Sequence, residues 1–417
     1  MTEVRRTPTE VDTVHDMPPR ASRRVRAGLL AGGVLLLAGC AKDAPQDTWQ
    51  PAGPNARSID NLQRPIFYIA GVIGVLVFAT IGYAIWKFKD RGQEIPEQGH
   101  GKAILEIGPI VLSATLLAGI SVPTVATVMK LNKTSDTQCV VIVTGQQWWW
   151  EYVYPVQDGC ATGGIKQPIV TSGQMALPAK TKVLAQIQSN DVIHSFWIPK
   201  LNGKRDAVPG RTHTLRLEAD QPGIYSGQCT EFCGLSHARM RMQVAALNQA
   251  DFDTWVAKQT APYEKPTDPA AVVGEGTFQA NCSRCHQVDG LTDADGAPVV
   301  SQPDLYVVSG NAPNLSHLMS RNTFAGAVWD LLTPECRDKV WHAKPEEFGA
   351  LYLQGVTREC LNEKDLRDWI RNAPAKKPMY ATDDQIARNN GMSRGMPNLK
   401  LNDDQISQII DYLVTRK

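Results

Sequence analysis

The stretch "CTEFCGLSHARM", residues 229–240, carries two thiols, an imidazole and a thioether at close spacing. Soft sulfur ligands and imidazole suit copper and zinc better than calcium or magnesium. A second imidazole, His194, lies in "SNDVIHSFWIP". Two cysteines and two histidines are compatible with a closed zinc site, and the cysteines could also form a disulfide beside unrelated histidines. Met240 favours copper, because a weakly bound methionine is typical of copper electron-transfer sites.

A second motif with its own chemistry is "NCSRCHQ" at 281–287, in which Cys282, Cys285 and His286 form the pattern C-x-x-C-H. This pattern attaches haem c: two thioether bonds hold the macrocycle, and the adjacent imidazole becomes the proximal iron ligand. The sequence therefore predicts a covalent haem in addition to the first metal site.

The elements that must position these motifs differ along the 417 residues, which are enough for two or three domains. Short β-rich runs between about 139 and 248 alternate with turn residues and predict an antiparallel sandwich or barrel. A linker rich in Pro and Ala covers 260–272, and helical patterns such as "DLRDWIRNA" follow it. The net charge of +1 gives no indication of nucleic-acid binding.

The N-terminus has the pattern of an export signal. Several arginines precede a short apolar run at 27–39, which ends in "LLLAGC". This ending resembles the lipobox of bacterial lipoproteins, so we expect a signal peptide at 1–39 and a lipidated Cys40 as the first mature residue. The alternative is a buried or membrane-spanning helix that ends in cysteine, but the run is short for a span.

Two longer apolar segments, 65–88 and 103–129, are each long enough to span a bilayer. The loop between them, "KDRGQEIPEQGHGK", is flanked by Lys and Arg, so the positive-inside bias places it in the cytoplasm. We therefore expect a transmembrane hairpin within 62–131, with the rest of the chain on the extracytoplasmic side of a bacterial cell membrane.

From about residue 62 to 244 the chain resembles subunit 2 of cytochrome c oxidase. The loop matches the family pattern C-x-E-x-C-x-x-x-H-x-x-M in full, and "GQQWWWEYVYP" resembles the family's aromatic segment. The stretch "DVIHSFWIPKLNGKRDAVPGR" resembles the segment that bears the other copper histidine. The resemblance implies a cupredoxin-like β-barrel at 132–259 that holds the dinuclear copper centre CuA.

The resemblance also implies a role for each ligand position. Two thiolates bridge a pair of copper ions, each imidazole binds one copper, and a thioether and a backbone carbonyl complete the set: Cys229, Cys233, His194, His237, Met240 and the carbonyl of Glu231. The side chain of Glu231 would face a magnesium ion at the interface with the catalytic subunit.

Two further residues match family positions. Trp148 matches the aromatic residue through which electrons arrive, although at least one of the tryptophans at 148–150 is expected only to pack in a core or an interface. Glu106 matches a glutamate near the mouth of a proton channel, and an ionisable residue in a membrane segment is a functional candidate by default. Its place near the cytoplasmic end also lets a carboxylate reach headgroup water at modest cost.

Residues 273–417 resemble a class I cytochrome c, which implies an all-α domain. The family places the distal methionine just before the last helix, and Met396 has this place in "GMPNLKLNDDQISQIIDYL". Met379 and Met392 are then packing or surface residues, and His317 is a weaker candidate that lies near the haem edge or is structural.

The four remaining cysteines pair by elimination in an oxidising compartment, as Cys139–Cys160 and Cys336–Cys360. Each closure would stabilise the fold by about 3 kcal/mol. Free buried thiols are the alternative. The segment from about 325 to 360 has no role that follows from its sequence.

The sequence thus predicts a multidomain protein: a two-helix membrane hairpin, a cupredoxin-like barrel and an all-α cytochrome c domain. It would relay electrons from cytochrome c or a cytochrome bc complex, through haem c and CuA, to catalytic subunit 1 and its companion membrane subunits. Nitrous oxide reductase also has the copper loop, but no large His-rich domain is present here, and quinol oxidase relatives lose the copper ligands. An anchored copper-storage protein would have no use for a haem, whereas an anchored electron-transfer protein outside an oxidase stays open as the alternative.

Overall fold

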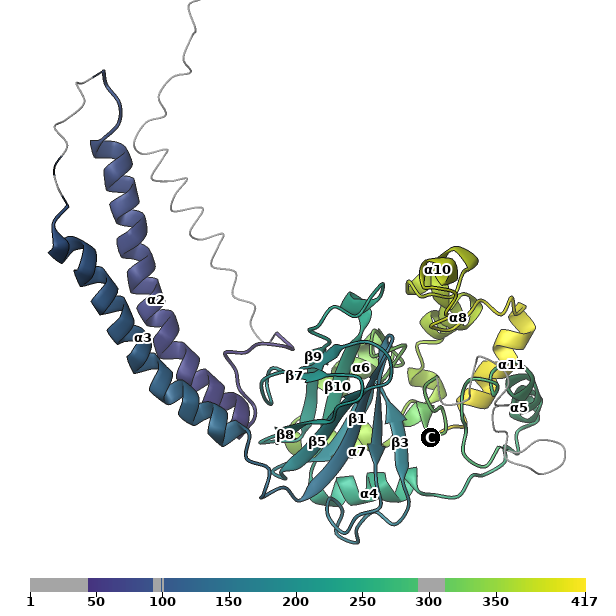
Figure 1. Cartoon of the computed structure of the whole chain (residues 1–417). Coiled ribbons are helices and arrows are strands. Elements are labelled where there is room, and N and C mark those ends of the chain that lie inside the picture. Colours follow the sequence, from purple (N-terminus) through teal and green to yellow (C-terminus); the bar gives the residue numbers. More distant parts are fainter. Residues whose placement is uncertain (1–43, 93–98, 100, 292–311) are drawn as a thin grey trace, which may run out of the picture. The chain divides into compact units, whose positions relative to one another are not determined.

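The computed structural model of the chain describes residues 44–92, 99, 101–291 and 312–417. The predicted signal peptide at 1–39 and the predicted lipidation site, Cys40, lie outside the described residues. Figure 1 shows the two long helices, the β domain and the C-terminal helices in chain order.

Two helices, α2 (Pro54–Lys87) and α3 (Ala103–Leu131), are long and apolar enough to cross a membrane. Helix α2 begins well before the predicted apolar segment, because its first turn belongs to the β domain rather than to a membrane span. There the buried Asn55 donates to the Arg216 carbonyl (2.9 Å) and accepts from the Arg216 guanidinium (2.8 Å). Arg57 forms an ion pair with Asp220 next to it.

The β domain holds one five-stranded sheet of order β3-β2-β1-β5-β8, a three-stranded sheet β4-β10-β9 and the pair β6-β7. The strands are β1 (Cys139–Gln146), β2 (Trp149–Tyr154), β3 (Ile169–Ser172), β4 (Gln174–Pro178), β5 (Val183–Ser189), β6 (His194–Phe196), β7 (Arg205–Ala207), β8 (His213–Leu217), β9 (Gly223–Gln228) and β10 (Arg241–Leu247). The predicted antiparallel arrangement holds for most strand pairs but was wrong for two, because β1 pairs with β5 and β4 with β10 in parallel. Parallel pairing needs a long connection, and three strands lie between β1 and β5 in the chain.

Alternation along the strands places the core between the sheets. In β5, Val183, Ala185 and Ile187 are fully buried while the residues between them are partly exposed. Helix α4 (Gln249–Gln259), which the sequence reading did not separate from the β-rich region, closes one end of the domain. Its Trp255 ring lies 5.2 Å from the ring of Tyr154 in β2.

The C-terminal region is largely helical, as its patterns predict, but it contains a short β-hairpin. Its elements are α5 (Pro269–Asn281), η2 (Leu318–Ser320), β11 (Thr323–Phe324), β12 (Trp329–Asp330), α6 (Pro334–Trp341), α7 (Pro345–Leu353), η3 (Arg358–Cys360), α8 (Glu363–Arg371), α9 (Ala373–Lys376), α10 (Asp383–Arg388) and α11 (Asp403–Leu413). Helix α5 begins inside the predicted linker, where Asp268 caps it and Pro269 takes its first position. Helices α5 and α11 pack together through Phe278 and Tyr412.

The described residues contain two disulfides, and each closes a loop within one region. One links Cys139, at the start of β1, to Cys160, and the other links Cys336 in α6 to Cys360 in η3. Among the described residues the free cysteines are Cys229, Cys233, Cys282 and Cys285. The four thiols that remain free are therefore those of the two chemical motifs.

Candidate metal centre and the adjoining cavity

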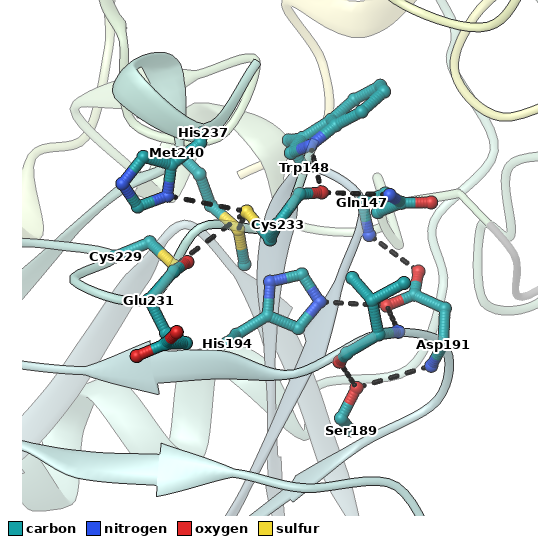
Figure 2. Close-up of polar contacts among 11 residues, drawn as sticks. Gln147, Trp148, Ser189, Asp191, His194, Cys229, Glu231, Cys233, His237 and Met240 are labelled. Atoms are coloured by element: carbon teal, nitrogen blue, oxygen red, sulfur yellow. Dashed lines mark hydrogen bonds and ion pairs between the residues drawn. The ribbon is translucent and has the colours of Figure 1, made fainter. Parts of the chain in front are cut away.

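The predicted copper ligands come from two loops of the β domain. The stretch 229–240 follows β9, passes through the short helix η1 (His237–Arg239) and leads directly into β10. His194 begins β6, and its ring lies against this loop (Figure 2). Strands β9 and β10, which flank the loop, pair with each other. The hydrogen bond from the Cys229 N–H to the Met240 carbonyl (2.9 Å) continues this pairing across the base of the loop. The loop is thus closed at its base by the sheet.

The donor atoms converge on one small volume. The ligand atoms of His194, Cys229 and Cys233 all lie within 4.8 Å of one another, and all three residues are buried. The Cys233 sulfur lies 3.8 Å from the Cys229 sulfur, 3.6 Å from His237 Nδ1 and 3.8 Å from the Met240 sulfur. The structure therefore brings together the thiols, imidazoles and thioether that the sequence reading selected.

His194 is oriented by the carboxylate of Asp191, which was not among the predicted site residues. Its Nε2 lies 2.7 Å from Asp191 Oδ1, and Asp191 Oδ2 accepts a hydrogen bond of 2.7 Å from the backbone N–H of Gln147. Nδ1 of His194 is buried without a hydrogen-bond partner. A metal-binding imidazole usually has its other nitrogen held in this way, so the unpartnered Nδ1 fits a metal ligand. The signal was present in the sequence as an Asp three positions before the histidine.

The charges of the site follow from its burial. Burial is the largest single influence and disfavours the ionised forms of Asp191 and His194, but the hydrogen bonds and opposite charges around them together outweigh it, so the pKa of Asp191 is lowered and that of His194 is raised. The hydrogen bond between the two thiols lowers the pKa of Cys229 to about 4 and raises that of Cys233. One thiolate is thus favoured before any metal binds, which is the form that ligates metal.

The backbone carbonyl and the side chain of Glu231 have different surroundings. Its backbone carbonyl oxygen lies 3.3 Å from the Cys229 sulfur, so this oxygen faces the ligand cluster. Its side chain is exposed. The neighbouring Phe232 and Leu235 are exposed as well, at 77% and 47%, which places apolar surface beside the carboxylate.

Trp148 and Trp150, two of the three tryptophans at 148–150, have different surroundings. Trp148 is 2% exposed, and its indole N–H donates to the Cys233 carbonyl at 2.9 Å, where the Gln147 side chain also donates (Figure 2). Its ring lies 5.3 Å from the ring of Tyr380, and its carbonyl accepts from the buried Lys377 ammonium at 2.7 Å. Trp150 is fully buried between His194 and Phe196 as part of the core.

A cavity adjoins Trp148 and the C-x-x-C-H motif. Its wall contains Cys282, Cys285 and His286 from the C-terminal region and Trp148 and Trp149 from the β domain. Most of the remaining wall is apolar, with contributions from Phe278, Leu318, Phe324, Trp369, Ile370, Ile409 and Leu413. An apolar cavity of this kind, with two thiols and an imidazole in its wall, fits a covalently attached haem.

The hydrogen bond and the burial of His286 give its ring the form that a metal ligand needs. His286 Nδ1 lies 2.8 Å from the Pro313 carbonyl, which can only accept, so Nδ1 carries the proton and Nε2 is left as a ligand. Burial lowers the pKa of His286, which keeps the ring neutral. His317 instead donates from Nδ1 to the carbonyl of Lys417 and does not line the cavity.

Two methionines line the cavity. Met396 is half-buried and Met379 is buried, and both line the cavity, whereas Met392 is 53% exposed and does not. Met379 packs against Gly395, where any Cβ would overlap its sulfur. The structure thus brings the predicted distal ligand, Met396, to the cavity and places a second methionine beside it.

Known proteins resemble the chain both in its β domain and over nearly its whole length. Residues 139–247 match the family model "Cytochrome C oxidase subunit II, periplasmic domain". Cytochrome c oxidase subunit 2 of Bacillus sp. strain PS3 is 31% identical over 401 residues, 92% of this chain and 94% of that protein. The same subunit of Alkalihalophilus pseudofirmus is 35% identical over 67% of this chain and 82% of that protein. The chain belongs to the cytochrome c oxidase subunit 2 family.

A solved periplasmic domain of subunit II of cytochrome oxidase from Bradyrhizobium japonicum is 28% identical, covers 31% of this chain and 96% of that domain, and has a TM-score of 0.27. Membership of the family makes the chain a subunit of a haem–copper oxidase and implies the CuA copper centre in the β domain. With α2 and α3, it also indicates a membrane-anchored subunit whose β domain is extracytoplasmic.

The remaining predicted residue, Glu106, lies in the first turn of α3 with its side chain exposed. Its place near the N-terminal end of the helix agrees with its position in the sequence pattern. A channel role stays a prediction, because the protons would have to continue through other subunits.

Proposed function

We propose that this subunit passes electrons from an external donor to the catalytic subunit of the oxidase, using a haem c in the C-terminal cavity and the CuA pair in the β domain. The observation that supports the proposal most is that one residue, Trp148, contacts both sites. Trp148 lines the cavity beside the C-x-x-C-H motif and, on its other side, hydrogen-bonds the carbonyl of Cys233.

The copper pair would be held by Cys229, Cys233, His194, His237, Met240 and the carbonyl of Glu231. When bound, it supplies a one-electron carrier whose charge is shared between two metal ions. The chain's own contribution is rigidity: paired strands β9 and β10 flank the loop, and Asp191 fixes the ring of His194. A ligand set held in one geometry needs little rearrangement when its charge changes.

The haem would be attached through Cys282 and Cys285, with His286 as its proximal ligand and Met396 as its distal ligand. When bound, it supplies the carrier that accepts the donor's electron. The hydrogen bond from His286 to Pro313 sets the ring tautomer, and most of the cavity wall is apolar. Residues 273–417 then act as a fused cytochrome c domain, and Trp148 is the residue through which the electron leaves it.

The partners follow from the exposed surface around the copper loops. Phe232, Leu235, Val192 and Ile193 are exposed apolar residues on the two loops that bear the ligands. Exposed apolar side chains gathered beside a site mark an interaction surface, and we assign this surface to catalytic subunit 1. The exposed carboxylate of Glu231 would bind magnesium at that interface. Both helices would cross the bacterial cell membrane, and the donor would be cytochrome c or a cytochrome bc complex.

The test is a pair of variants in the assembled oxidase, observed by spectroscopy. Cys233→Ser should remove the EPR signal of a mixed-valence copper pair and leave the covalent c-type haem band, whereas Cys282→Ser should prevent normal two-bond haem attachment and leave the copper signal. Oxygen consumption driven by the external donor should be lost in both. The control is the double variant Cys336→Ala with Cys360→Ala, which removes two cysteines and the disulfide between them but no ligand. A mononuclear copper signal, zinc in the site or no covalent haem in the unaltered protein would contradict the proposal.

A further inference from the structure

The segment 313–377, which we call the bracket segment, runs from Pro313 beside the haem motif to Lys377 beside Trp148. It contains β11, β12, α6 to α9 and the second disulfide. It includes the stretch from about 325 to 360, whose role does not follow from its sequence. Its contacts reach both the β domain and the helices around the C-terminal cavity.

One contact is a buried cation. Arg321 is 4% exposed, and its guanidinium donates to the carbonyl and hydroxyl of Ser172, at the end of β3, and to the Asn314 carbonyl (2.6 Å). Burial lowers the pKa of Arg321 to about 10. A buried guanidinium is tolerated only where acceptors replace its water, so the bracket segment must meet β3 in one register for these bonds to form.

A second contact centres on Gln174 at the start of β4. Its buried side-chain oxygen accepts from the backbone N–H of Asn322 (3.1 Å) and from the Tyr352 hydroxyl (3.0 Å), and both residues lie in the bracket segment. Its side-chain nitrogen donates to Gln243 of β10 at 2.8 Å. One side chain of the β domain therefore ties two separate parts of the bracket segment to the sheet that leads into the copper loop.

A third contact lies directly on Trp148. The Lys377 ammonium bridges the carbonyls of Trp148 and Ala325 at 2.7 and 2.9 Å, and the Arg241 amide donates to the Gly326 carbonyl at 3.0 Å. Gly326 has φ +75°, and a Cβ there would lie 2.5 Å from the Trp148 carbonyl oxygen. The close approach therefore requires glycine.

The bracket segment is fixed on its other side to the cavity helices and to the haem motif. The Met319 amide donates to the Arg416 carbonyl just after α11 at 2.7 Å, and the Leu315 amide donates to the Gln287 carbonyl at 2.8 Å. Lys258 of α4 donates to the Leu353 carbonyl at 2.6 Å. The same segment thus binds the copper domain, the residues next to C-x-x-C-H and the last helix.

We propose that the bracket segment is an internal docking element that holds the C-terminal region on the β domain in one fixed arrangement, so that its cavity stays against Trp148. That the fixed arrangement serves haem-to-copper electron transfer rests on the function proposed above; the docking itself does not. A linker alone would give a tethered region that reaches the copper site by repeated encounters. Buried contacts on both sides replace these encounters with a preformed complex.

The experiment uses the complete oxidase and the variant Gln174→Leu, which removes both acceptor contacts to the bracket segment. Its matched control is Gln188→Leu, whose side chain donates only to Thr144 within the β domain. Amide hydrogen exchange at Asn322 should be slow in the unaltered protein and in the control, and at least about fivefold faster in Gln174→Leu. Fast exchange in the unaltered protein, or no change in Gln174→Leu, would overturn the docking proposal.

Two further readouts address the electron step. The rate from photoreduced haem c to copper should not depend on solvent viscosity in the unaltered protein and the control, and should become slower and viscosity-dependent in Gln174→Leu. Pulsed EPR between oxidised haem and copper should give one narrow distance that broadens in the variant. A viscosity-dependent rate in the unaltered protein would overturn the fixed arrangement, whereas slow exchange without any haem-to-copper transfer would sink only the proposed function.

If Gln174→Leu does not assemble, Tyr352→Phe serves in its place, because it removes a single hydroxyl and keeps the ring. It should accelerate exchange at Asn322 by a smaller factor than expected for Gln174→Leu, and the proposal is contradicted if exchange at Asn322 is unchanged.

Discussion

The copper loop and the C-terminal cavity differ in how their ligands are brought together. Most of the copper donors lie within 229–240 and are closed at the base by the pairing of β9 and β10, so they are gathered without metal. At the cavity, the two thiols and His286 lie together, but the distal candidates come from a segment more than ninety residues further along the chain. Local spacing determines the first site, and packing of distant segments determines the second.

This difference decides how each site tolerates change. In the copper loop a lost donor leaves the remaining donors in place, because strands and hydrogen bonds hold them. At the cavity two methionines line the wall, so packing must select one of them.

The distal ligand gives the largest effect. Met396→Leu should abolish the charge-transfer band of methionine-ligated ferric haem and lower the reduction potential, because methionine ligation raises it, by more than about 60 mV. Met379→Leu should keep the band and the potential, since a volume-conserving swap in a packed position costs less than about 1.5 kcal/mol. Absorption spectroscopy and redox titration of the oxidase measure both. Loss of the band in Met379→Leu alone would instead make Met379 the distal ligand.

The same contrast explains what the sequence could and could not predict. The spacing of Cys229, Cys233, His237 and Met240 is a local pattern, and their loop closes as local strand pairing dictates. The parallel pairing of β1 with β5 depends on which strands meet across the core, and the alternation along each strand carries no such information. The sequence named Met379 among the methionines near the last helix, but its place in the cavity wall depends on packing against Gly395, which no local pattern predicts.

The bracket segment shows the same limit at larger scale. Its sequence contains helix caps and a cysteine pair, which indicate helices and a crosslink, but some of its contacts to the β domain are made by backbone groups, such as those of Asn322 and Gly326. Backbone donors and acceptors look alike in every sequence. The partner side chains, Gln174 and Ser172, are ordinary polar residues of the β domain, and only their burial in the folded chain identifies them.

The two disulfides test whether the regions unfold together. Replacing Cys139 and Cys160 by Ala opens a crosslink of sequence separation 21 and should lower the free energy of unfolding by about 3 kcal/mol. Replacing Cys336 and Cys360, with a separation of 24, should lower it by a similar amount. Urea unfolding of the full chain in detergent, followed by tryptophan fluorescence and by far-ultraviolet circular dichroism, should give one shared transition in each case. Two transitions that shift independently would show that the bracket segment does not couple the regions.

The smallest expected effect concerns Glu151 in β2, within the same strand as Trp149 and Trp150. Burial raises the pKa of Glu151 to about 6 from an ordinary value of 4.5. A carboxyl whose folded pKa is raised stabilises the fold fully below its unfolded pKa, and this contribution is lost as the pH rises through the folded pKa. The unaltered chain should therefore lose about 2 kcal/mol of unfolding free energy between pH 4.5 and pH 7 from this group. Glu151→Gln should lack that loss while it keeps the copper EPR signal, because the side chain is not a ligand. Parallel pH profiles of the two proteins would contradict the assignment and would mean that the β domain around the copper site relaxes enough to hydrate this carboxylate.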